Sequence, residues 1–134
     1  MVTAGPGCLA EGVMAAPTLQ ELTRKKCRPC EGGVAPMGGA EAKAYLANLP
    51  GWELSADGRL IGRTYVMRWF MDAIEFIQKI AEVAEAEDHH PDIHLTGYRR
   101  LRIELMTHAI GGLSENDFIV AAKVDSLPKQ LKPS

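Results

Sequence analysis

The sequence has no long apolar run, little net charge and few cysteines. No stretch approaches the roughly 20 consecutive apolar residues that a membrane-spanning helix needs. The formal net charge is -2 over 134 residues, and the longest basic run is Arg24-Lys25-Lys26. Such a chain has no general attraction to nucleic-acid backbones or anionic lipid. Membrane insertion and direct nucleic-acid binding are therefore not expected.

The three cysteines, Cys8, Cys27 and Cys30, are an odd set without the spacing of a disulfide framework. This pattern favours a reducing compartment. Residues 1–13 mix glycine, proline and glutamate without an apolar block, so we expect no signal peptide. Arginine and serine are too scarce there to favour a transit peptide. We predict a cytoplasmic location, with import into an organelle left open.

The length fits one domain, and the composition of 46% hydrophobic and 24% charged residues is that of a globular protein with one core. We divide the chain into a flexible extension (1–38), a folded domain (39–127) and a short tail (128–134). Residues 1–17 are rich in glycine, alanine and proline, and residues 19–37 contain Cys27-Arg-Pro-Cys30 and Gly32-Gly33. We therefore expect this extension to be a tail and a loop that stay outside the core.

Apolar spacing and turn residues predict the order helix, two strands, helix, two strands, helix. The predicted elements are a helix from Gly39 to Pro50, strands 52–54 and 60–66 around an Asp57-Gly58 turn, a helix from Phe70 to about Asp88, strands 93–96 and 101–107, and a helix from Ser114 to Leu127. The fold class is therefore α+β. We expect a four-stranded antiparallel sheet with three helices packed on one face.

Two of these elements carry strong periodic patterns. In the second helix an apolar stripe recurs every three or four residues: Phe70, Ala73, Ile74, Ile77, Ile80, Ala81 and Ala84. In the last strand Leu101, Ile103 and Leu105 alternate with charged residues, as in a sheet with one buried face. The final helix has a capping signal, with Ser114 before it and Asp117 at its third position.

The main chemical signal is the clustering of all four histidines, His89, His90, His94 and His108, within twenty residues. Imidazole exchanges protons near neutral pH because its unperturbed pKa is about 6.5. Three uses stay open on the residues alone: ordinary surface or core histidines, a metal site, or acid–base catalysis. Adjacent residues do not face the same way on a regular element, which disfavours His89 and His90 as ligands of one metal. Cys27 and Cys30 form only half of a structural zinc site, so no metal is predicted.

Two carboxylates near the histidines each have two possible roles. Asp117 can complete the helix cap, or it can orient an imidazole and stabilise its charged form. Glu85 lies one helical turn before His89 and could lie beneath it, although a solvated helix face is the ordinary place for such a residue.

The run Glu85-Ala-Glu-Asp-His89-His90-Pro91 to Tyr98, followed by Thr107-His108 to Asp117, resembles the signature of the pterin-4a-carbinolamine dehydratases. Pro50-Gly51-Trp52 and the amphipathic helix match as well, so the similarity covers roughly residues 39 to 127. The chain departs from animal members in Asp92-Ile93-His94, where they carry aromatic residues, and in the spacing to Tyr98. The Cys27–Cys30 segment is similar to an N-terminal extension of some non-animal members.

The resemblance implies a metal-free, cofactor-free enzyme that removes water from 4a-hydroxytetrahydropterin, with the chain assembled as a homodimer or homotetramer. It implies His89, His90, His108 and Asp117 as catalytic residues. It implies substrate-binding positions at Glu85, Pro91, Asp92 and Trp52.

Two competing functions remain open. Animal members also serve as dimerisation partners of a homeodomain transcription factor, so a protein partner bound through an exposed helical face is one alternative. A repurposed fold that binds pterins without turnover is the other, and the complete set of histidines disfavours it.

Overall fold

The computed structural model describes residues 16–29 and 34–133. Its four strands form one antiparallel sheet in the order β1-β2-β4-β3. The strands are β1 (Glu53–Leu54), β2 (Ile61–Val66), β3 (Asp92–Thr96) and β4 (Arg100–Leu105). The helices of the described residues are α1 (Leu19–Arg24), α2 (Gly39–Leu46), α3 (Phe70–Glu87), the short 3-10 helix η1 (His108–Ile110) and α4 (Glu115–Ser126). The predicted α+β class is confirmed.

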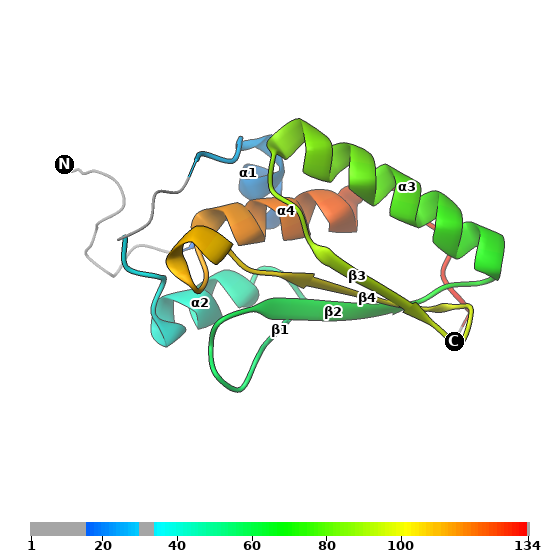
Figure 1. Ribbon diagram of the computed structural model, residues 1–134, viewed down its shortest axis with the longest axis horizontal. Coiled ribbons are helices and arrows are strands. Elements are labelled where there is room, and N and C mark those ends of the chain that lie inside the picture. The colour runs from blue at the N-terminus through cyan, green and yellow to red at the C-terminus, as the bar shows by residue number, and fades with distance from the viewer. Residues whose placement is uncertain (1–15, 30–33, 134) are drawn as a thin grey trace.

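The helices are arranged in a layer that covers the sheet. Figure 1 shows α3 and α4 over one face, with α1 beside α4 and α2 near β1 at the end of the sheet. Along β4 the residues Leu101, Ile103 and Leu105 are buried, whereas Arg102 and Glu104 between them are partly exposed. The predicted alternation is therefore confirmed, and it places the core between the sheet and the helix layer.

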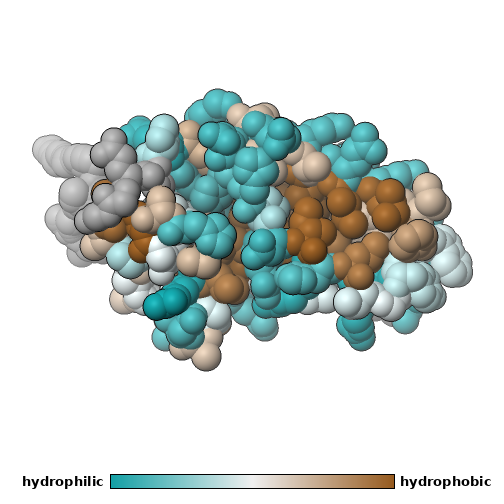
Figure 2. Space-filling view, in the orientation of Figure 1, coloured by the Kyte–Doolittle hydropathy of each residue, from teal (hydrophilic) through white to brown (hydrophobic). Residues whose placement is uncertain are grey.

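Helix α3 ends as predicted, but its buried stripe is rotated from the predicted one. Phe76, Ile80 and Ala84 are buried, whereas Phe70 and Ile74 are 49% and 38% exposed. Figure 2 shows apolar side chains gathered on the part of the surface where Figure 1 places α3 and the edge strand β3. An apolar stripe wider than one contact face leaves its margin on the surface.

The prediction that residues 19–37 form a loop outside the core is wrong for α1. Thr18 caps this helix, because its side chain accepts from the N–H of Glu21 while the Glu21 carboxylate accepts from the N–H of Thr18. Leu22 is fully buried in the core. A six-residue helix is too short to show an apolar period, and its stability comes from packing.

Other parts of the predicted division stay untested. Residues 1–15 and Cys30 to Gly33 lie outside the described residues. At the other end, the tail is tied to the sheet: the N–H of Lys132 donates to the carbonyl of Val66, and Leu131 pairs with Met67.

Candidate active site

The site is built where the C-terminal end of α3 meets the N-terminal end of α4. Asp88 closes α3 in the left-handed conformation, with φ of 53°, and this sharp turn directs the chain through His89. The His89 Nε2 atom lies 2.6 Å from Oδ1 of Asp117. Asp117 is fully buried, and the His89 side chain is 12% exposed. An imidazole and a carboxylate are thus paired away from water.

Asp117 makes contacts that fit both of the roles that the sequence left open. Its Oδ2 accepts from the N–H of Ser114 at 3.0 Å and from the hydroxyl of Thr107 at 2.9 Å. The Ser114 hydroxyl in turn accepts from the N–H of Asn116, so the predicted helix cap is present. Because one carboxylate oxygen holds the cap and the other holds His89, the helix end itself fixes the orientation of the imidazole.

Glu85 contacts a different histidine from the one predicted. Its Oε2 lies 2.7 Å from Nε2 of His90, not beneath His89. The physical reason is the left-handed Asp88, which breaks the helical spacing between positions 85 and 89. The Glu85 and His90 side chains are 77% and 53% exposed, so the pair adds little to stability.

His108 completes the cluster from a third element. It begins η1, a turn that is closed by the bridge between Thr107 and Gly112. His89, His90 and His108 all line one hollow of about 370 Å³. The structure therefore brings together the three histidines that the resemblance implied as catalytic, although they lie on separate segments.

None of the four predicted substrate-binding positions, Glu85, Pro91, Asp92 and Trp52, is among the residues that line this hollow. Trp52 is buried in the core, and its indole N–H donates to Oδ2 of Asp125 at 3.0 Å. That placement does not fit a substrate contact. Asp92 begins the edge strand and pairs with Glu104, and Pro91 lies just before it. The fourth histidine, His94, also faces Glu104, with 3.5 Å between Nε2 and Oε1.

The residues that line the hollow but were not predicted as site residues include Arg28, Pro29 and Asn116. Arg28 and Pro29 belong to the segment interpreted as a loop. Asn116 lies inside the capping motif, in which Ser114 and Asp117 carry the recognisable signal. The sequence carries no signal that residues 28 and 116 meet, because 88 positions separate them.

A polar network lies beside the hollow. The buried Glu87 carboxylate accepts from the N–H of Cys27 at 2.8 Å and from Nζ of Lys123 at 2.6 Å. Burial by itself would raise the pKa of Glu87, but the Cys27 N–H and the Lys123 ammonium outweigh it and hold this pKa below its ordinary value. Burial, followed by the nearby Glu87 charge, raises the pKa of the Cys27 thiol to about 12.

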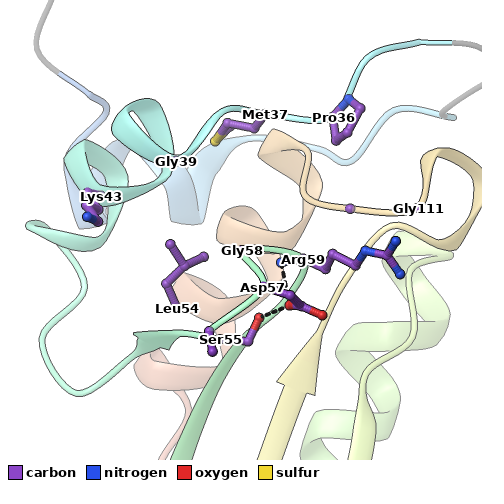
Figure 3. A pocket seen from close by; sticks show the side chains of 12 residues that line it. Pro36, Met37, Gly39, Lys43, Leu54, Ser55, Asp57, Gly58, Arg59 and Gly111 are labelled. Atoms are coloured by element: carbon purple, nitrogen blue, oxygen red, sulfur yellow. Dashed lines mark hydrogen bonds between the residues drawn. The ribbon is translucent and has the colours of Figure 1, made fainter.

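A larger hollow, of about 560 Å³, lies between the β1–β2 turn, the start of α2 and the Gly111-Gly112 turn (Figure 3). Its Asp57 carboxylate is already used, since it accepts from the Ser55 hydroxyl at 2.7 Å and from the N–H of Arg59 at 3.0 Å. Figure 3 shows the side chains of Lys43 and Arg59 at opposite ends of this hollow. We therefore place the candidate active site at the smaller hollow, which holds the histidines.

Within 16–29 and 34–133, no group of three or more histidine, cysteine, aspartate or glutamate side chains is arranged to hold a metal ion. Among the same residues, no helix is long and apolar enough to cross a membrane.

Comparison with known proteins identifies the family. The model of the pterin 4 alpha carbinolamine dehydratases matches residues 35–127. The chain belongs to this family. A putative pterin-4-alpha-carbinolamine dehydratase of Halorhodospira halophila is 54% identical over 106 residues, which cover 79% of this chain and 96% of the relative. The predicted enzyme class, a hydro-lyase, is confirmed at the level of the family.

Two further relatives extend the comparison. The Arabidopsis thaliana pterin-4-alpha-carbinolamine dehydratase 2, mitochondrial, is 40% identical over 124 residues, covering 90% of this chain and 66% of the relative. Among solved structures, a transcriptional coactivator/pterin dehydratase from Brucella melitensis is 30% identical, with a TM-score of 0.64 over 68% of this chain and 96% of that one. The predicted resemblance is confirmed.

Proposed function

We propose that this protein dehydrates 4a-hydroxytetrahydropterin to quinonoid dihydropterin by histidine acid–base catalysis, as a step in pterin recycling. The observation that carries the proposal is the convergence of His89, His90 and His108 on one hollow beside the buried Asp117. The names of the relatives support the choice of substrate.

The reaction needs proton transfer and no change of oxidation state. The C4a–O bond breaks, the hydroxyl leaves as water after it receives a proton, and N5 loses its proton as the C4a–N5 double bond forms. One acid and one base are sufficient, each worth about 10²–10⁴-fold in rate. Imidazoles with different surroundings can divide these tasks at neutral pH.

The surroundings of the three histidines support a division of roles. The side chain of His89 is only 12% exposed and is held by Asp117, so its ring has a fixed orientation suited to positioning the substrate. His90 and His108 are exposed to the hollow. We assign the larger catalytic contributions to His90 and His108, and to Asp117 the orientation of His89. Neither a metal nor a cofactor enters this scheme.

The test is a stopped-flow absorbance assay with freshly generated 4a-hydroxytetrahydropterin after metal chelation. The wild-type protein should accelerate the dehydration above the enzyme-free rate, and His108→Ala should lose about 10²–10⁴-fold of that acceleration. His94→Ala is the matched control, because His94 lies on β3 outside the hollow and should retain full activity. Equal activity of wild type, His90→Ala and His108→Ala would contradict the assignment.

A homo-oligomer is part of the proposal, and the exposed apolar residues at the start of α3 support it. Trp69 and Met71 are 59% and 61% exposed, and β3 lies next to β4 at the edge of the sheet that the described residues form. Apolar clusters and open sheet edges mark interaction surfaces. Light scattering should report a dimer or tetramer whose mass falls in Met71→Glu but not in Val34→Glu, a control site that is 58% exposed.

The same surface supports the alternative of a different protein partner. The binding role is favoured if neither the wild type nor the histidine variants show dehydratase activity while Met71→Glu abolishes binding of a protein partner. A cytoplasmic location also stays a proposal, since it depends on the cysteine pattern and the composition of residues 1–13.

A further inference from the structure

Residues Cys27 to Pro29, which we call the strap, cross from α1 over the two helix ends that form the site. At its first residue, the N–H of Cys27 donates to Oε1 of Glu87 at 2.8 Å. Glu87 is itself held by Lys123 and is only 9% exposed. The strap is thus tied to the last residue of α3, two positions before His89.

At its second residue, the strap is clamped by the side-chain amide of Asn116. The N–H of Arg28 donates to Oδ1 of Asn116 at 3.0 Å, and Nδ2 of Asn116 donates back to the carbonyl of Arg28 at 2.5 Å. Asn116 is 7% exposed and directly precedes Asp117. A paired donor and acceptor on one planar amide fix both the position and the direction of the backbone at residue 28.

These contacts place the strap in the wall of the histidine hollow. Arg28 and Pro29 line it together with His89, His90 and His108. Of the described residues that line it, Arg28 is the one side chain that carries a positive charge at every physiological pH. The strap backbone is fixed to the residues beside His89 and Asp117, so Arg28 has a defined place relative to that pair.

We propose that Arg28 is a substrate-binding residue and that the strap serves to hold it in the histidine site. This inference rests on the proposed function and names a further contact within it. The guanidinium has up to five N–H donors, and a pterin offers oxygen acceptors at its ring carbonyl and on the substituent at C6. A hydrogen bond from a charged donor to such an oxygen stabilises the bound substrate before reaction as well as during it. Loss of the contact therefore raises KM more than it lowers kcat.

The clamp makes it possible to remove the Arg28 side chain without disturbing the strap backbone. Glu87 and Asn116 bind the strap through main-chain atoms of residues 27 and 28, so Arg28→Ala removes the guanidinium and leaves these hydrogen bonds in place. Arg24→Ala is the matched control, because Arg24 is exposed on α1 and does not line the hollow. Arg28→Lys keeps the charge but not the fork of donors.

The experiment is an isothermal titration of each variant with 7,8-dihydrobiopterin and with pterin-6-carboxylate, alongside stopped-flow kinetics. We expect Arg28→Ala to raise the Kd about tenfold or more, Arg28→Lys to recover part of the loss, and Arg24→Ala to match the wild type. A loss for both pterins indicates a contact with a group that the two share, either the ring carbonyl or an oxygen of the C6 substituent, and a loss for pterin-6-carboxylate alone places the contact at its carboxylate. Wild-type Kd and KM values in Arg28→Ala overturn the proposal.

A double-mutant cycle tests the strap itself. Asn116→Ala removes the clamp, and if its effect runs through Arg28, the double variant with Arg28→Ala should bind no more weakly than Arg28→Ala alone. Fully additive losses would overturn the clamping role. Because binding is read without turnover, the outcomes stay separable from the proposed function. A wild type that binds pterins but does not accelerate dehydration contradicts the enzyme activity, and the Arg28 comparison is still read from Kd.

Discussion

Each end of α4 carries an aspartate shielded from water, Asp117 fully and Asp125 with 12% of its side chain exposed, and the two carboxylates have different partners. Asp117 and Asp125 lie about 12 Å apart along the helix. Asp117 shares its oxygens between a helix cap and His89, at the edge of the histidine hollow. Asp125 accepts from the Trp52 indole, the Arg63 guanidinium and the Tyr65 hydroxyl.

The difference lies in the partners rather than in the carboxylates. Burial and the adjacent Asp125 charge raise the pKa of the Tyr65 phenol, so it stays a proton donor at every physiological pH, as the indole does. The imidazole beside Asp117 belongs to the residue type that exchanges protons near neutrality. A shielded carboxylate among permanent donors is a structural contact, whereas one beside an imidazole that lines a hollow is placed for the catalytic role that we propose.

The sharpest way to test this comparison is Asp117→Asn. The amide keeps the size of the side chain and can still accept from Ser114, but it no longer carries the charge that fixes the His89 tautomer and orientation. We expect about a 100-fold loss of dehydratase activity in the stopped-flow assay. Activity within threefold of the wild type, in protein shown by circular dichroism to be folded, would contradict the role of the pair.

The converse variant is Asp125→Ala. It leaves the Trp52 and Tyr65 donors without their acceptor, so we expect the free energy of unfolding to fall by about 2–4 kcal/mol. The loss is measured by urea denaturation. Activity per folded molecule should stay at the wild-type value. A specific loss of turnover would contradict the purely structural role of Asp125.

Glu87 is a third carboxylate to compare with Asp117 and Asp125, and it binds the backbone of the strap. Its folded-state pKa is lowered, so the stability it contributes is present above its ordinary pKa of 4.5 and is lost as pH falls through the folded value. The difference in unfolding free energy between wild type and Glu87→Gln should therefore shrink as the pH is lowered below 4.5. If this difference in unfolding free energy is constant from pH 7 to pH 3, Glu87 is not ionised where it binds the strap.

The smallest effect concerns Cys27, the thiol beside Glu87. With its pKa raised to about 12, this group has almost no thiolate at pH 8.5 and should react slowly with iodoacetamide. Peptide mapping by mass spectrometry would compare the rate for Cys27 in native and urea-unfolded protein. Equal rates in the two states would show that the folded protein does not suppress the thiolate of Cys27.

The pattern of neighbouring residues was sufficient to predict much of the fold. The alternation in β4, the end of α3 near Asp88 and the cap formed by Ser114 and Asp117 depend on contacts within a few positions of the chain. The family motif likewise indicated the three histidines that share the hollow. Local sequence carries such features because their physical causes are local.

Other features were decided only by the tertiary structure. The burial of Leu22, the hydrogen bond from Trp52 to Asp125 and the clamp of Asn116 on Arg28 join segments that have no pattern in common. Glu85 binds His90 because a single left-handed residue changes the direction of the chain. The sequence by itself determined the elements and the chemical groups of the site. Packing decided which distant side chains meet there, because each such contact depends on how two helices and a sheet fill one core.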